Sequence, residues 1–130
     1  MKGSIQTALR KLTQATRPLA LRSAGTEKST LSIIRTVGRR SGRAYETPVV
    51  AVEHDDSVLI ALPYGERTDW LKNVLATGNA TVVTHGRSSA VDRPQIVPMS
   101  EATTFFGPKE QQRHRRFGVD TCLRVHRMAA

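Results

Sequence analysis

Residues 30–62 read TLSIIRTVGRRSGRAYETPVVAVEHDDSVLIAL, and this stretch decides the fold class. Three runs within it, residues 30–37, 47–52 and 58–62, are rich in the β-branched residues that strands favour. A basic segment with two glycines separates the first two runs, and an Asp-Asp pair at residues 55–56 separates the last two. The stretch therefore predicts two β-hairpins in immediate succession.

The remaining strand signals continue this antiparallel pattern. Residues 80–85 and 90–97 predict a third hairpin that turns about residues 86–88. Pro94 would place the second of these strands at an edge or at a bulge. Residues 119–125 alternate apolar and polar side chains, which is typical of a closing strand. About six strands in mostly consecutive antiparallel order favour a barrel, because closure removes the exposed edges of a sheet.

Helices are expected before and between the strands. Residues 4–22 carry apolar side chains three and four positions apart, which predicts an amphipathic helix up to about Arg17, where Pro18 should end it. A second, short helix is expected between an N-cap at Thr68 and a stop at Gly78. We therefore expect an N-terminal helix and linker over residues 1–24 and one barrel domain over residues 25–130.

The composition indicates a single globular domain with excess positive charge. The chain has 130 residues, a formal net charge of +9 at pH 7 and one cysteine. One cysteine cannot form an internal disulfide and the four histidines show no ligand spacing, so we expect no metal site. The sequence contains no secretory signal and no apolar run long enough to span a membrane, which favours a cytoplasmic protein. The charge attracts anions such as phosphates, carboxylates, nucleic acid or acidic lipid head groups.

Residues 35–43 form the most basic stretch of the chain. Glycines let the backbone turn with its N–H groups directed outward, and guanidinium groups bind phosphate or carboxylate in a bidentate way. The stretch predicts an anion site, and a solvated hairpin tip is an equally supported alternative. A Walker loop is excluded because the G-x-x-x-x-G-K-S/T spacing is absent. The basic residues of this stretch are Arg35, Arg39, Arg40 and Arg43.

A second candidate site is the loop that follows residues 58–62. Residues 62–65 read Leu-Pro-Tyr-Gly and lead into the capped helix, an arrangement that exposes backbone amides to a flat ring or an anion. Trp70 on that helix is interpreted first as a core residue. Asn73 faces inward on the same helix, where its amide needs hydrogen-bond partners from a ligand or from a neighbouring loop.

Basic residues return near the C-terminus without a binding pattern. Residues 113–116 read Arg-His-Arg-Arg on a helix expected at residues 109–116, and they spread around most of its circumference. This distribution is typical of a solvated surface. Nucleic acid is disfavoured because aromatic residues make up only 5% of the chain and no strand carries paired aromatics for base stacking.

Taken together, these segments resemble the deazaflavin-dependent nitroreductase family over roughly residues 25–125. The resemblance rests on residues 36–42 (TVGRRSG), residues 47–49 (TPV), the glycine loop and the spacing Trp70-x-x-Asn73. It implies a mainly β fold, a six-stranded antiparallel split β-barrel of the FMN-binding type with an N-terminal helix and short helices. It also implies coenzyme F420 as the cofactor, with FMN as the alternative, and a homodimer.

The resemblance also assigns binding roles. It implies that residues 39–42 hold the phosphate and the acidic glutamyl tail of the coenzyme, and that residues 62–65 lie against the deazaflavin ring. It implies no metal ion and identifies no catalytic residue. The implied coenzyme-binding residues are Gly38, Arg39, Arg40, Ser41, Gly42, Arg43, Pro48, Leu62, Pro63, Tyr64, Gly65, Trp70 and Asn73.

The activity implied by the resemblance is hydride transfer from the reduced coenzyme to a quinone-like or nitroaromatic acceptor. Nitroreducing members carry a serine where this chain has Leu62-Pro63 and a tyrosine where it has Leu71. Their tyrosine-rich C-terminal segment has no counterpart, since the only tyrosines are Tyr45 and Tyr64. A quinone-like acceptor therefore fits this chain better than a nitroaromatic one.

Two other functions remain open at this point. One is a non-catalytic carrier of a flavin, haem or fatty acid on the same fold. The other is a basic membrane-surface module that uses the N-terminal helix. Contact with the inner face of the membrane is also compatible with a quinone reductase, because such an enzyme must meet a lipophilic acceptor.

Overall fold

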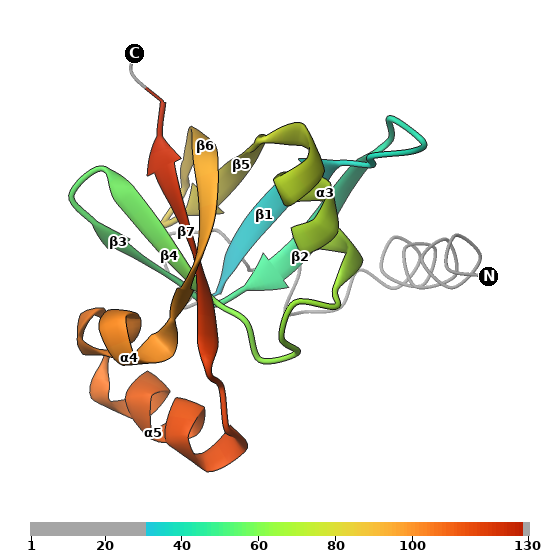
Figure 1. The fold of residues 1–130 in the computed structure, drawn as a ribbon. Helices are drawn as coiled ribbons and strands as arrows, with labels where there is room; N and C mark the ends of the chain where they lie inside the picture. The colour runs from blue at the N-terminus through green and yellow to red at the C-terminus, as the bar shows by residue number, and fades with distance from the viewer. Residues whose placement is uncertain (1–30, 129–130) are drawn as a thin grey trace, which may run out of the picture.

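The computed structural model describes residues 31–128, in which seven strands form one antiparallel sheet (Figure 1). The strand order is β2-β1-β5-β6-β7-β4-β3. Hairpins join β1 to β2, β3 to β4 and β5 to β6, as predicted. The strands are β1 (Ser32–Val37), β2 (Ala44–Val49), β3 (Ala51–His54), β4 (Ser57–Ala61), β5 (Asn79–Thr84), β6 (Arg87–Pro98) and β7 (Thr121–Arg127).

Two groups of helices flank the sheet. Helix α3 (Asp69–Thr77) packs beside β1 and β5, with Thr68 at its N-cap as predicted. Gly78 ends it in the left-handed conformation, with a φ of 79°. The second group lies at the start of β7 (Figure 1). It consists of α4 (Met99–Ala102), the 3-10 helix η1 (Thr103–Phe105) and α5 (Pro108–Phe117).

One bent strand closes the sheet into a split barrel. β2 lies at one end of the strand order and β3 at the other, yet only Val50 separates them in the chain. The Ala61 backbone N–H donates to the Val50 carbonyl oxygen at 3.1 Å, so pairing with β4 reaches the bend. The first half of the bent strand therefore pairs with β1, and the second half pairs with β4. The single strand expected at residues 47–52 is divided here, which corrects the strand count from six to seven.

The hairpin of β5 and β6 differs from the sequence prediction in the position of its turn and agrees with it in the position of the bulge. The turn is His85-Gly86 rather than residues 86–88, and both of its φ angles are positive, at 50° and 78°. A two-residue turn of this conformation matches the twist of the flanking strands. Pro94 lies within the register shift between β6 and β7 at residues 92–95, which confirms the predicted bulge.

Two apolar clusters hold the described part of the fold together. All five residues of β4 are buried, because alternate side chains serve the two clusters. The larger cluster includes Ile34, Val58, Ile60, Leu71, Val74, Val82, Val91 and Leu123, with Trp70 packed against it. The smaller includes Leu59, Ala61, Met99, Phe106, Val119 and Cys122. Burial raises the pKa of the Cys122 thiol to about 12, so this cysteine stays protonated in the core.

Three sequence expectations concern the rest of the chain or its surroundings. The helix expected from residue 4 to about residue 17 and the boundary after residue 24 lie outside the described residues. Between residues 31 and 128, no helix has the length and apolar character needed to cross a membrane. The same part of the chain contains no group of three or more His, Cys, Asp or Glu side chains that could hold a metal ion.

Candidate functional site

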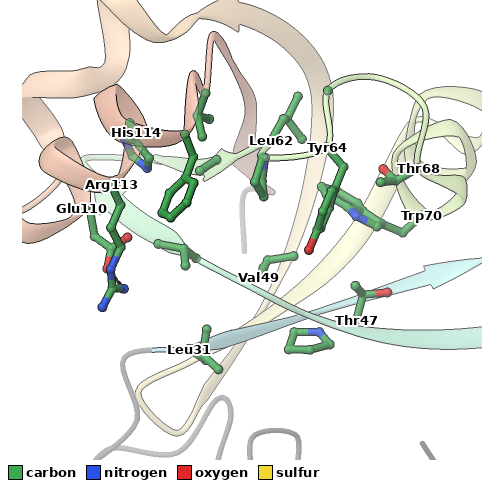
Figure 2. Close-up of a pocket in the computed structure, with 17 residues that line it drawn as sticks. Leu31, Thr47, Val49, Leu62, Tyr64, Thr68, Trp70, Glu110, Arg113 and His114 are labelled. Atoms are coloured by element: carbon green, nitrogen blue, oxygen red, sulfur yellow. Dashed lines mark hydrogen bonds and ion pairs between the residues drawn. The ribbon is translucent and has the colours of Figure 1, made fainter. Parts of the chain in front are cut away.

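A cavity of about 770 Å³ lies at the split of the barrel (Figure 2). β2 and the bend after it line it along residues 47–50. One wall consists of residues 62–65 together with Thr68 and Trp70, and α5 forms the other wall (Figure 2). The volume is within the range of small-molecule sites.

The cavity lies between β2 and the segment that follows β4, because that segment leaves the sheet without pairing with β2. After Ala61, the Leu62 N–H donates to the Thr121 carbonyl oxygen at 3.1 Å, and the chain then leaves the sheet. Gly65, with a φ of 68°, turns the chain, and its N–H donates to the Leu62 carbonyl oxygen at 3.0 Å. Within the described residues β2 pairs only with β1, so its other edge borders the cavity.

The lining is mainly apolar and carries few polar groups. Tyr64 is 79% exposed and therefore stands at the mouth of the cavity. Trp70 lines the cavity and also packs against the barrel core, as its sequence position predicts. The Thr68 hydroxyl is buried and has no hydrogen-bond partner in the described part of the chain. Such a lining suits a flat apolar ring with polar atoms at its edge.

The arginine-rich stretch forms a tight turn between β1 and β2. The Gly38 N–H donates to the Arg43 carbonyl oxygen at 2.7 Å, and the Gly42 N–H donates to the Gly38 carbonyl oxygen at 2.9 Å. Gly42 has a φ of 70°, which favours glycine. A Cβ atom on Gly38 would lie 2.5 Å from Ser41 Oγ and 2.9 Å from the Tyr45 ring. The conformation of the turn therefore requires glycine at both positions.

Arg39 is anchored on α3 rather than directed into solvent. Its Nη1 donates to Asn73 Oδ1 at 2.7 Å, and its backbone N–H donates to the same oxygen at 3.2 Å. Its Nη2 lies 3.3 Å from Asp69 Oδ1. Asn73 is only 3% exposed, so its amide oxygen serves the turn. Of the two interpretations of Asn73, the contact with a neighbouring loop is the one that the structure contains.

Two of the four arginines are available to an external anion. Arg40 and Arg43 are exposed, and neither guanidinium has an ion-pair or hydrogen-bond partner among residues 31–128. Arg35, by contrast, pairs with Glu46 at 2.8 Å. The positive charge that the turn presents to solvent therefore comes from Arg40 and Arg43.

The turn and the cavity lie along one strand. From Arg43 to Thr47 the chain advances roughly 13 Å, at about 3.3 Å per residue. A second connection runs through α3, because Thr68 lines the cavity and the next residue, Asp69, binds Arg39. Six of the residues predicted for the site surround the cavity: Pro48, Leu62, Pro63, Tyr64, Gly65 and Trp70. The other predicted residues lie at the turn or anchor it: Gly38, Arg39, Arg40, Ser41, Gly42, Arg43 and Asn73.

The wall formed by α5 corrects the interpretation of residues 113–116 as a wholly solvated surface. His114 is 5% exposed and lines the cavity, with its ring edge-on to Phe106 at a centroid distance of 4.8 Å. Phe117 also lines the cavity, one helical turn further on. Arg115 and Arg116 are exposed, in agreement with the prediction.

Spacing is the signal that identifies this wall. Glu110 and His114 are four residues apart, as are Arg113 and Phe117, so all four share one face of the helix. Arg113 Nη1 forms an ion pair with Glu110 Oε1 at 2.9 Å on that face. The charged side chains of this pair satisfy each other, which leaves His114 Nδ1 as the buried side-chain polar atom on α5 without a partner in the described residues.

The sequence profile of the F420H(2)-dependent quinone reductase family matches residues 8–116, which is most of the chain. The chain belongs to this family. The reductase is accordingly an enzyme whose cofactor is coenzyme F420, in agreement with the family resemblance of its motifs. Among curated proteins, none matches the reductase in sequence.

Solved structures share the split-barrel fold of the reductase. An F420-H2 dependent reductase (FDR-A) is 13% identical with a TM-score of 0.58, and the alignment covers 75% of this chain and 94% of that one. A protein described as a domain-swapped dimer is 14% identical, with a TM-score of 0.58 and coverages of 87% and 94%. An F420 reductase is 11% identical, with a TM-score of 0.54 and coverages of 79% and 90%. At these identities the likeness concerns the fold alone.

Burial of His114 makes the stability of the reductase depend on pH. Burial lowers the pKa of His114, an effect that the Glu110 carboxylate partly opposes. The unfolded chain binds a proton near pH 6.5, whereas the folded protein does so only at lower pH. We expect the free energy of unfolding to fall as the pH drops below about 6.5, by at most about 1.4 kcal/mol per pH unit from this group. Urea denaturation at a series of pH values measures this slope.

The variant His114→Leu isolates the contribution of this one histidine. His54, His85 and His126 are present in both proteins, so the difference between the two pH profiles belongs to His114. The two profiles should run parallel above about pH 6.5 and diverge below it. Parallel profiles throughout would contradict the expectation.

Proposed function

We propose that the reductase transfers a hydride from reduced coenzyme F420 to a quinone-type acceptor bound in the cavity at the barrel split. The observation that carries this proposal is the layout of the bent strand. It follows directly on a turn with two arginines that are unpaired within residues 31–128, and then lines an apolar cavity. A molecule with an anionic arm and a flat ring can occupy both places at once.

The turn fits the anionic arm of the coenzyme. Arg40 and Arg43 would bind its phosphate and its glutamyl carboxylates through charge-assisted hydrogen bonds. Gly38, Ser41 and Gly42 shape the turn that presents the two guanidinium groups. Arg39 and Asn73 would act indirectly, because their hydrogen bonds fix the turn on α3.

The cavity fits the ring of the coenzyme. Pro48, Trp70 and residues 62–65 provide apolar surfaces, and the edge of β2 that is unpaired in the described part of the chain borders the cavity. The buried Thr68 hydroxyl has no partner within the described residues, and a polar atom at the edge of a bound ring would satisfy it. The residues that surround the cavity therefore agree with a tricyclic ring that carries carbonyl and amide groups.

The chemistry divides between the coenzyme and the protein. When bound, the reduced coenzyme supplies the hydride. The apolar walls exclude water and hold the acceptor flat against the ring, which brings the reacting atoms into contact. Tyr64 at the mouth is exposed and can cover the acceptor from the solvent side. The protein thus contributes mainly binding, orientation and exclusion of water.

The lining favours a quinone over a nitroaromatic acceptor. The cavity walls are dominated by aliphatic and aromatic side chains, which suit a lipophilic ring. Tyr64 is the one tyrosine that lines the cavity, so few hydroxyl groups are present to hold a nitro group. The family to which the chain belongs supports the same acceptor class.

Titration with oxidised coenzyme F420, followed by its fluorescence, tests the binding part of this proposal. We expect saturable binding at low salt that weakens as salt is added, because the arm of the coenzyme is anionic. With reduced coenzyme and menadione as the acceptor, we expect the coenzyme to be reoxidised. The result that would overturn the proposal is no saturable binding at low salt. A purified protein that retains haem or fatty acid and shows no turnover would favour a carrier instead.

We also propose that the reductase forms a homodimer. The related fold described as a domain-swapped dimer supports this, as do two exposed aromatic side chains beside the cavity, Tyr64 at 79% and Phe117 at 69%. Light scattering coupled to gel filtration should give twice the chain mass of 14.3 kDa. A mass equal to one chain at micromolar concentration would contradict the dimer.

A further inference from the structure

His114 occupies an unusual position in the wall of the cavity. It is 5% exposed, on the face of α5 that lines the cavity, and Figure 2 shows it on the side opposite Tyr64. The edge-on contact with Phe106 fixes one side of its ring. The imidazole is therefore held in place by packing and is not a mobile surface group.

The hydrogen-bonding capacity of this imidazole is unused. Its Nδ1 is fully buried, whereas its Nε2 is not, and neither ring nitrogen forms a hydrogen bond with any residue in the 31–128 range. Buried polar groups are almost always hydrogen-bonded. A neutral imidazole always offers one N–H donor and one acceptor. The charged groups that line the cavity with it, Glu110 and Arg113, pair with each other on the same helix.

An imidazole without a hydrogen-bond partner in an apolar cavity indicates a ligand that forms the missing hydrogen bond. Burial lowers the pKa of His114, so the ring is neutral near pH 7 and binds as a hydrogen-bond donor without a net charge. A quinone carries two carbonyl oxygens and no donors. Either carbonyl oxygen can accept the hydrogen bond that the N–H of a neutral imidazole does not make within the described residues.

We propose that His114 is a catalytic residue whose Nε2–H, the ring nitrogen that is not fully buried, donates a hydrogen bond to a carbonyl oxygen of the quinone. The inference rests on the proposed function and names the group that recognises the acceptor. As the hydride leaves the C–H bond of the reduced coenzyme, an O–H bond forms at one quinone oxygen. The ring electrons shift, the opposite oxygen takes the negative charge, and a proton from water completes the hydroquinone. His114 stabilises that second oxygen while its charge develops.

The kinetic test compares two substitutions of His114 with a control on the same helix. His114→Leu removes the donor, His114→Gln retains an N–H donor, and Arg115→Leu changes an exposed residue outside the cavity. With reduced coenzyme F420 and menadione, we expect kcat to fall about 100-fold in His114→Leu. The kcat of His114→Gln should be at least tenfold higher than that of His114→Leu. The kcat of Arg115→Leu should match that of the parent. The Kd of the oxidised coenzyme should be the same in all four proteins.

A second measurement uses the unaltered protein and needs no turnover. Menadione is added to the complex with oxidised coenzyme F420, and the ¹⁵N signals of labelled histidine are recorded. One of the four histidines should change its signals, and that resonance should be missing in His114→Leu. Quenching of Trp70, the only tryptophan, reports that menadione has entered the cavity.

The outcomes separate this inference from the proposed function. An unchanged kcat in His114→Leu, or quenching of Trp70 without a change of the His114 signals, would overturn the role of His114. Equal losses in coenzyme affinity and in kcat would also overturn it, because they indicate a structural role. A parent protein that binds coenzyme but reduces no quinone would overturn the proposed function, and the ¹⁵N signals would still decide whether His114 binds the quinone.

Discussion

Replacing Arg40 and Arg43 together with alanine should weaken the binding of coenzyme F420 by about 10²- to 10⁴-fold. Each guanidinium is expected to form a charge-assisted hydrogen bond worth about 1.5 to 3 kcal/mol, and each 1.4 kcal/mol corresponds to a factor of ten. Both side chains are exposed and unpaired within the described residues, so the free energy of unfolding should change little. Fluorescence titration at low salt measures the affinity, and urea denaturation measures the stability.

The matched control for this experiment removes the same charge elsewhere. Arg115 and Arg116 are exposed on α5 and do not line the cavity. Their double alanine variant should bind the coenzyme nearly as well as the parent, because distant surface charges are screened by salt. If both double variants lose affinity equally, the net charge of the protein attracts the coenzyme and the turn has no specific role.

Replacing Asn73 with leucine should both destabilise the protein and loosen the arginine turn. The substitution removes the acceptor for two N–H groups of Arg39, one from the backbone and one from the side chain. Leaving such half-buried donors unpaired costs about 1 to 3 kcal/mol, which should appear as a lower free energy of unfolding in urea. Coenzyme affinity should also fall, because the turn that carries Arg40 is no longer fixed on α3.

A double-mutant cycle with Arg39→Ala tests whether this coupling is specific. If Asn73 acts through Arg39, the two substitutions together should cost less than the sum of their separate costs. Lys72→Leu on the same helix serves as the control for the helix itself, because Lys72 is not a partner of Arg39 in these contacts. An Asn73→Leu protein as stable as its parent would show that the anchor is not needed.

Much of the strand pattern was predictable because it depends on local chemistry. Runs of β-branched residues identify β1, β4 and β5, and Pro94 identifies its bulge through its missing N–H. The bend at Val50 is different, since the sequence Val-Val-Ala-Val on either side of it is equally suited to a straight strand. It is set by pairing with two different partners, β1 and β4, that lie far apart in the sheet order.

The site could be predicted in part for similar reasons. The glycine turn and the loop of residues 62–65 have local signatures, and both lie at the proposed coenzyme site. The anchoring of Arg39 depends on α3, thirty or more residues further along the chain, and no local pattern reveals it. His114 was hidden by its charged neighbours, because its burial depends on the packing of α5 against Phe106 and around the cavity.

The position of β7 between β6 and β4 has a consequence for how the protein is made. β4 is buried throughout, yet one of its two partner strands follows about 60 residues later in the chain. At about 5 to 20 residues per second, a ribosome needs several seconds to complete that distance. During this interval the unpaired edge and the apolar faces of β4 are open to association with other nascent chains. Chaperone binding to the growing polypeptide should therefore be strongest between the emergence of β4 and that of β7.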